Sequence, residues 1–299
     1  MSRSVSVRRT AARRTAARTT AARKAIARGA TARRAAVAGA VVAVLAGGTA
    51  CGASAADDTE PEHRTFALQG RTLTVDSDES GLEIIASDDA ESGSVEVTRW
   101  FEGSVMVGKE PRVTWSMDGD RLTLRLRCSG FVADCSAKHR VEVPRGVAVK
   151  VEDGDGAISA SGFTDPLDIR TGDGNVRVSD TTGTLAVRTT DGNVRITDST
   201  GPADLRTGDG NIDADLGSRT VTTHSGDGNV RLTLGAVPDR VETRSGDGNV
   251  TVALPRAGYR VTTETGDGGV EVSVPRDDSS DHIVTARTGD GKVTLRTAN

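Results

Sequence analysis

Eight aspartates recur through the second half of the chain at nearly constant spacing, and each is followed directly by glycine. The separations between successive members are 18, 18, 18, 18, 20, 20 and 23 residues. The aspartates are Asp155, Asp173, Asp191, Asp209, Asp227, Asp247, Asp267 and Asp290. Carboxylate oxygens are the ligands that calcium prefers, and a column of carboxylates repels itself unless a cation or hydrogen bonds relieve it. The candidate metal ligands are therefore Asp173, Asp191, Asp209, Asp227 and Asp247.

The other corner of each repeat argues against calcium. An 18-residue period equals two nonapeptides of a calcium-binding β-roll, but that architecture needs Gly-rich Asp turns at both corners. Here the second corner reads T-T-G-T, S-T-G-P or L-G-S-R. Each Asp could instead accept backbone N–H groups in its own turn, with Gly and Asn in left-handed conformations. The prediction is that no cofactor is bound, with a calcium-stabilised envelope protein as the alternative.

The same repetition argues against catalysis. A residue that returns in every repeat meets a folding requirement, whereas an active site needs its acids once. The histidines His63, His139, His224 and His282 are scattered, and the sequence shows no nucleophile elbow, metal-binding His pair or phosphate loop. We predict that the protein is not an enzyme; a β-helix that acts on polysaccharides is the second alternative.

Two short arms flank every turn. Leu167 and Ile169 alternate with Asp168 and Arg170 before the turn, and the segment after it alternates in the same way, so each arm has one apolar and one charged face. An antiparallel meander would leave a continuous apolar face uncovered, whereas a coil folds that face onto itself and stacks on the next copy. The predicted fold is all-β: a β-solenoid, or parallel β-helix, of about eight 18–23-residue coils over residues 152–299.

Residues 66–151 also alternate but do not repeat, and they predict an irregular N-terminal β module that caps the solenoid. Asp118-Gly119 between two apolar runs indicates a tight hairpin. Trp100, Phe101 and Trp115 form the main aromatic cluster, for which core packing is favoured over a sugar-stacking platform.

Residues 1–50 have the composition of a targeting segment. They hold ten Arg and one Lys with no acid, and residues 35–48 are apolar over the length of a signal-peptide core. Arg33 and Arg34 leave the twin-arginine route open beside ordinary secretion. Without this segment, 27 bases face 42 acids, a formal charge of about −15 against −4 for the whole chain, which argues against a nucleic-acid partner.

The three cysteines fit an exported chain. Gly48-Thr49-Ala50-Cys51 resembles a lipobox with Gly in place of the usual Leu, so Cys51 is the candidate lipid attachment site and residues 51–65 a flexible tether. Cleavage near Ala53–Ala55 would instead release a secreted protein. Cys128 and Cys135 are then left as an even pair, predicted to form a disulfide that contributes on the order of 2.5 kcal/mol.

The recurrent T-G-D-G-N-V unit behind a signal peptide and a β-rich lead segment resembles the bacterial putative-adhesin family of unknown function, which has lipoprotein members in actinobacteria. The likeness covers roughly residues 66–298. It implies a β-solenoid surface domain without established catalysis. The expected protein is a non-catalytic adhesion, display or structural module on the outer face of the cell membrane, held by its N-terminal lipid and facing an unidentified envelope ligand.

Overall fold

The computed structural model describes residues 54–55 and 58–298. The predicted signal peptide and Cys51 lie outside these residues. Ala50–Asn299 forms one compact unit, and its buried apolar side chains are drawn from residues 55 to 295. Because this unit contains its own core, it can fold without the segment that precedes it. Within the described part of the chain, no helix has the length and apolar character needed to cross a bilayer.

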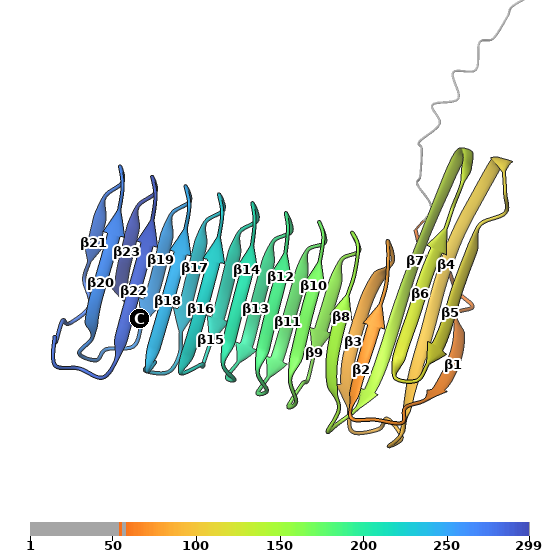
Figure 1. Cartoon of the computed structure of the whole chain (residues 1–299), viewed down its shortest axis with the longest axis horizontal. Helices are drawn as coiled ribbons and strands as arrows, with labels where there is room; N and C mark the ends of the chain where they lie inside the picture. The colour runs from red at the N-terminus through yellow and green to blue at the C-terminus, as the bar shows by residue number, and fades with distance from the viewer. Residues whose placement is uncertain (1–53, 56–57, 299) are drawn as a thin grey trace, which may run out of the picture. The chain divides into compact units, whose positions relative to one another are not determined.

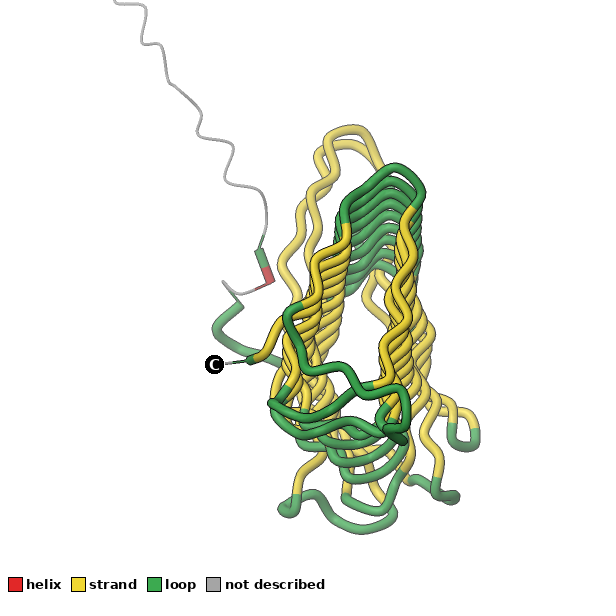
Figure 2. The backbone as a smooth tube through the Cα atoms, turned by 90° about the vertical axis from the view of Figure 1, so that its left-hand side faces the viewer, coloured by secondary structure: helices red, strands yellow, loops and turns green. Residues whose placement is uncertain are grey.

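Two sheets face each other across an apolar interior (Figures 1 and 2). The twelve-stranded sheet contains, in spatial order, β1 (Glu62–Ala67), β4 (Ser94–Gly108), β7 (Gly130–Pro144), β3 (Gly81–Ser87), β9 (Ile158–Ser161), β11 (Val176–Thr181), β13 (Val194–Ser199), β15 (Ile212–Leu216), β17 (Val230–Leu234), β19 (Val250–Leu254), β23 (Val293–Thr297) and β21 (Val270–Val272).

The strands of the eleven-stranded sheet are named here from the opposite end of the stack. It contains β20 (Arg260–Thr265), β22 (Ile283–Thr288), β18 (Arg240–Ser245), β16 (Thr220–Ser225), β14 (Ala203–Thr207), β12 (Leu185–Thr189), β10 (Leu167–Thr171), β8 (Ala148–Glu152), β2 (Thr72–Asp76), β6 (Arg121–Arg127) and β5 (Arg112–Asp118).

Each repeat is one coil, with one strand in each sheet and the Asp-Gly turn between them. The strands pair in parallel with those of the neighbouring coils, so that β10 lies between β8 and β12, and β11 between β9 and β13. The eight predicted coils are therefore confirmed, and a meander of hairpins is excluded. Seen along the stack, the coils superpose as flattened loops (Figure 2).

The apolar interior is built from columns of aliphatic side chains, one per coil at the strand spacing of about 4.8 Å. One column lies directly after the Asp-Gly turns, and all of its members are at most 1% exposed: Ile158, Val176, Val194, Ile212, Val230, Val250 and Val293. Val270 continues this column in the outermost coil, where no further coil covers it, and is 46% exposed. Burial within the stack therefore needs a neighbouring coil on each side.

The order of coils in space departs from their order in the sequence at both ends. The last coil of the chain, β22–β23, lies between β18–β19 and β20–β21. Residues 277–282 belong to the connection from β21 to β22 that carries the chain back by one coil. At the other end, β2–β3 lies between β6–β7 and β8–β9. The last coil of the chain is thus not the outermost one, whereas at the other end the N-terminal strand β1 is the edge strand of its sheet.

Residues 66–151 were expected to form an irregular cap, and the structure shows a mixed arrangement. β2–β3 and β6–β7 are two further coils of the parallel stack, whereas β1, β4 and β5 pair antiparallel and close this end. The predicted hairpin is present between β5 and β6, with Gly119 at a φ of 55°.

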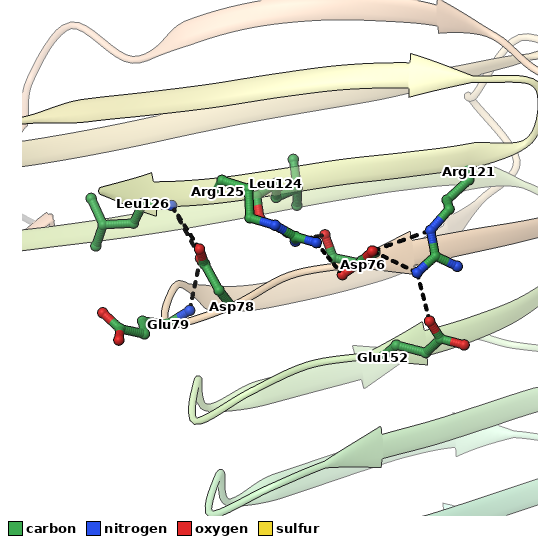
Figure 3. Close-up of polar contacts among 8 residues, drawn as sticks. All are labelled: Asp76, Asp78, Glu79, Arg121, Leu124, Arg125, Leu126 and Glu152. Carbon is green, nitrogen blue, oxygen red and sulfur yellow. Dashed lines mark hydrogen bonds and ion pairs between the residues drawn. The ribbon is translucent and has the colours of Figure 1, made fainter. Parts of the chain in front are cut away.

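An ion-pair cluster holds the inserted strand β2 between β6 and β8 (Figure 3). Asp76 accepts hydrogen bonds from Arg121 and Arg125, and Arg121 also contacts Glu152 on β8, with nitrogen–oxygen distances of 2.5, 2.7 and 2.7 Å. Partial burial alone would raise the pKa of Asp76, but the two guanidinium groups outweigh it and hold that pKa below its ordinary value. The cluster therefore joins three strands that are distant in sequence.

Candidate ligand-binding surface

A column of hydroxyls lies behind the Asp-Gly turns, buried in every coil except the outermost, where Thr265 is half-buried. Its members are Thr171, Thr189, Thr207, Ser225, Ser245, Thr265 and Thr288. Each hydroxyl donates to the carbonyl oxygen of a corner glycine in the neighbouring coil, as Thr207 does to Gly192 at 2.9 Å. In most coils it also accepts the N–H group three residues later, as Thr207 does from Gly210 at 3.1 Å. These hydroxyls supply the hydrogen bonds that the backbone groups of the turn need, a role that was predicted for the aspartates.

The corner glycines are required by close packing and not by left-handed backbone. In the described residues positive φ at glycine occurs only outside the repeated Asp-Gly turns, so the expectation of left-handed Gly and Asn in these turns is wrong. A Cβ atom on Gly192 would instead collide with the carbonyl oxygen of Gly174 in the coil beneath. The repeated glycine is therefore set by coil-to-coil contact.

The predicted calcium ligands occupy equivalent positions on the exposed edge of the stack. Asp173, Asp191, Asp209, Asp227 and Asp247 lie one per coil, and all are exposed. Across residues 58–298 no group of three or more His, Cys, Asp or Glu side chains is placed to hold a metal ion. The glycine carbonyls of the corner point into the stack and accept the hydroxyl bonds described above. The donor set thus fits calcium poorly, because it consists of one carboxylate per coil.

Beside the aspartates runs a ladder of asparagine amides: Asn175, Asn193, Asn211, Asn229 and Asn249. The Oδ1 atom of each of the first four accepts both the backbone N–H and the side-chain Nδ2 of the next, at 3.0 to 3.2 Å, and that of Asn249 accepts the backbone N–H of Lys292 at 2.9 Å. An amide nitrogen carries two hydrogens, and the ladder uses one of them. Each step therefore presents one further donor to an outside group.

A groove follows this ladder on the outer face of the twelve-stranded sheet. It has a volume of about 570 Å³ and spans five coils, from β13 to β23. Besides the amides, its charged lining residues are Arg195, Asp213, Arg231 and Lys292. Arg195 pairs with Asp213 at 3.3 Å, and Lys292 pairs with Glu271, which lies outside the lining, at 2.7 Å, whereas Arg231 forms no ion pair with any described residue. The groove is polar, has three cations against one anion, and has no aromatic side chain in its lining.

The eleven-stranded sheet carries a second cationic row on the other side of the turns. Six consecutive coils place a basic side chain in register: Arg170, Arg188, Arg206, His224, Arg244 and Arg287. Four of these arginines are paired with Asp168, Asp204 or Glu264 at 2.9 to 3.3 Å. Acids on the same face thus compensate most of this row, as they do two of the three groove cations. The hollow and the amide ladder, and not charge, therefore favour the groove as the ligand-binding surface.

Two titratable groups inside the fold, one half-buried and one fully buried, were not singled out by the sequence. Asp153 stands where the later coils have the column hydroxyl, its Oδ1 is buried without a partner, and burial raises its pKa to about 6. His139 is fully buried in β7 with both ring nitrogens unpartnered, and burial, together with the nearby Arg99, lowers its pKa to about 4. The Thr-to-Asp exchange in the first repeat was the available signal for Asp153.

The predicted disulfide is present: Cys128 and Cys135 are joined, with a Cα–Cα distance of 6.2 Å. Of the predicted aromatic cluster, only Trp115 is part of the core packing, and Trp100 is half-buried beside Lys138 and Arg140. Trp115 packs against the core, contacts the edge of Phe66 and lies under the guanidinium of Arg99, 4.4 Å from its ring centre. The groove and the aromatic cluster therefore lie on different elements.

No curated protein matches this chain in sequence. Among solved structures, one from Parabacteroides merdae named a putative adhesin is 12% identical, with a TM-score of 0.50, over 81% of this chain and 97% of that one. One of the same name from Bacteroides fragilis is 16% identical, with a TM-score of 0.46, over 80% and 98%. At these identities the likeness concerns the fold. The family model named Toastrack DUF4097 matches residues 50–299, and the chain belongs to that family.

Proposed function

We propose that this protein is a non-catalytic adhesion module of the cell surface. It binds an extended anionic polysaccharide of a cell envelope along the groove that follows the asparagine ladder. The name of the solved relative from Parabacteroides merdae supports the adhesive role, and its fold is the one found here. The alternative within the same class is a display or structural module without a ligand of its own.

The groove is the observation that carries this proposal. Five coils at about 4.8 Å give it a length of roughly 20 Å, enough for several sugar rings. The amide ladder repeats one donor per coil, and the unpaired Arg231 adds positive charge between the ion-paired Arg195 and Lys292. A linear ligand with hydroxyl and carboxylate or phosphate groups would meet a donor at every step.

The lining of the groove contains no aromatic side chain, and this limits how the groove can bind sugars. Sugar binding through stacking is not available in this groove, so affinity comes from hydrogen bonds and charge. Exposed charges are screened above about 0.1 M salt, so binding should weaken steeply as ionic strength rises.

Binding of acidic and neutral polysaccharides to residues 52–299 tests the ligand class. The Arg195→Gln, Arg231→Gln double variant is expected to lose at least tenfold in affinity for the acidic polymer, about 1.4 kcal/mol. Arg256→Gln removes an exposed cation outside the groove and is the matched control. Equal binding by wild type and double variant, or equal binding of neutral and acidic polymers, would refute the assignment.

We further propose that Cys51 carries the lipid that holds the protein on the outer face of the membrane. The small residues before Cys51 and the apolar run at 35–48 support this. Growth with labelled palmitate should label the wild type and not Cys51→Ala. Label retained by Cys51→Ala would contradict anchoring through this residue, and a released, unlabelled wild type would favour simple secretion.

A further inference from the structure

The end of the antiparallel β4–β7 pair, where β4 leads into β5 and β6 into β7, exposes large apolar side chains. Met106, Val107 and Phe131 are 78%, 66% and 77% exposed, and together they are named the apolar tip. Only one other large apolar side chain of the described residues is exposed, Val270 in the outermost coil at the opposite end of the stack. Exposed apolar groups that cluster at one place indicate an interaction site.

The β4–β7 pair carries this tip well beyond the coils. β7 pairs with β3 through residues 138–144, while residues 130–137 continue past the end of β3 and pair only with β4. Eight residues of strand extend about 25 Å. The projection rises above the stacked turns in Figure 2 and above the neighbouring strands in Figure 1. The Cys128–Cys135 bridge ties the end of β6 to β7 just below the tip.

The alternation of the strands is lost at this tip. Residues 105–107 read V-M-V, and Phe131 lies directly opposite Val107 in the antiparallel ladder. Both faces of the ladder are thus apolar, and a sheet can bury only one of them against its own core. No described segment covers the other face, so its apolar side chains are free to contact another molecule.

Basic side chains surround the apolar tip. Arg112 and Arg127 lie directly opposite each other across β5 and β6, and both are exposed. Like charges in this position repel each other, and neither has an ion pair with any residue between 58 and 298. Lys109 adds a third cation, and Glu110 is the one acid in the two connections of the tip. An uncompensated Arg–Arg pair next to apolar side chains points to an anionic ligand.

We propose that the apolar tip docks into the surface of a lipid bilayer that contains anionic lipids. Met106, Val107 and Phe131 enter the boundary between headgroups and acyl chains, and Arg112 and Arg127 contact lipid phosphates. A narrow, convex, apolar projection with a basic rim fits an interface of this kind, because the bilayer accepts the apolar groups while its surface charge attracts the rim. The described chain also enters the body at this end, where β1 pairs with β4. The docking does not depend on a lipid at Cys51.

Flotation with vesicles tests the docking on residues 52–299, which lack both the apolar leader and Cys51. Wild type should bind vesicles of phosphatidylcholine with phosphatidylglycerol and bind pure phosphatidylcholine much more weakly. Met106→Ser with Phe131→Ser should weaken binding at least tenfold. Val270→Ser removes an exposed apolar side chain elsewhere and should bind like wild type. Arg112→Gln with Arg127→Gln should abolish the preference for phosphatidylglycerol while leaving weak residual binding.

Insertion of the tip into the bilayer is measured separately, with the Phe131→Trp variant. Its fluorescence should be quenched by brominated acyl chains, whereas Trp100 and Trp115, which lie away from the tip, should be quenched little in the parent protein. Failure of the wild type to float with anionic vesicles would overturn the proposal and leave a protein partner as the occupant of the tip. Equal binding by the Met106→Ser, Phe131→Ser and Val270→Ser proteins would overturn it as well.

Discussion

Asp153 and His139 give the stability of this protein two opposing dependences on pH. The pKa of His139 falls from 6.5 to about 4 on folding, so its contribution is present above pH 6.5 and is lost as the pH falls towards 4. The pKa of Asp153 rises from 3.8 to about 6, so the folded state binds the proton more tightly and becomes less stable as the pH rises from 3.8 to 6. The two effects overlap between pH 4 and 6 and partly cancel.

The magnitudes follow from these shifts at about 1.4 kcal/mol per pKa unit. Near pH 4 the imidazole of His139 is protonated in the unfolded chain but resists protonation in the folded protein. This difference lowers the free energy of unfolding by about 3 kcal/mol. The corresponding figure for Asp153 is also about 3 kcal/mol before screening, and about 1–2 kcal/mol after it, because this side chain keeps some access to water. Together, His139 and Asp153 should therefore lower the free energy of unfolding of the wild type by only about 1–2 kcal/mol when the pH falls from 7 to 4.

Single substitutions separate the two effects. Asp153→Thr restores the hydroxyl of the later coils and should be more stable than wild type by about 1–2 kcal/mol at pH 7, with no gain near pH 4. His139→Leu should gain about 3 kcal/mol relative to wild type as the pH falls from 7 to 4. Urea unfolding of residues 52–299 at intervals over this range measures both differences. A difference between Asp153→Thr and wild type that is constant with pH would refute the reasoning for Asp153, and a constant difference for His139→Leu would refute it for that residue.

Further outcomes concern the turns and the inserted strand. Thr207→Val should lose about 1–3 kcal/mol of stability, because the Gly192 carbonyl and the Gly210 N–H lose their partner, while Thr207→Ser should lose little, since serine fills the same position elsewhere. Gly192→Ala should lose at least about 2 kcal/mol through its collision with the coil beneath, measured by the same denaturation. Asp76→Asn should lose about 1 kcal/mol, with lower hydrogen-exchange protection of β2, because its two arginines lose their shared anion. Calcium at about 1 mM should leave the unfolding midpoint unchanged, and a rise that Asp209→Asn abolishes would restore the metal hypothesis.

The sequence determined the coil, its turn and the face that each arm buries. These features follow from local rules: period-two alternation assigns residues to the interior, and the 18-residue period places each turn over the previous one. The disulfide followed from an even pair of cysteines in a chain whose N-terminal sequence predicts export. The hydroxyl column was present in the repeat as the Thr or Ser two residues before Asp, but its role depends on carbonyls of the neighbouring coil.

Only the tertiary structure decided which coil lies beside which. The coils β2–β3 and β22–β23 sit out of sequence order, because every coil has the same apolar interior and the same strand spacing, so a local pattern does not specify its neighbour. Long-range partners make that choice, such as Asp76 with Arg121 and Arg125. The groove and the apolar tip arise in the same way, since each brings together side chains from strands whose adjacency is set by the whole stack.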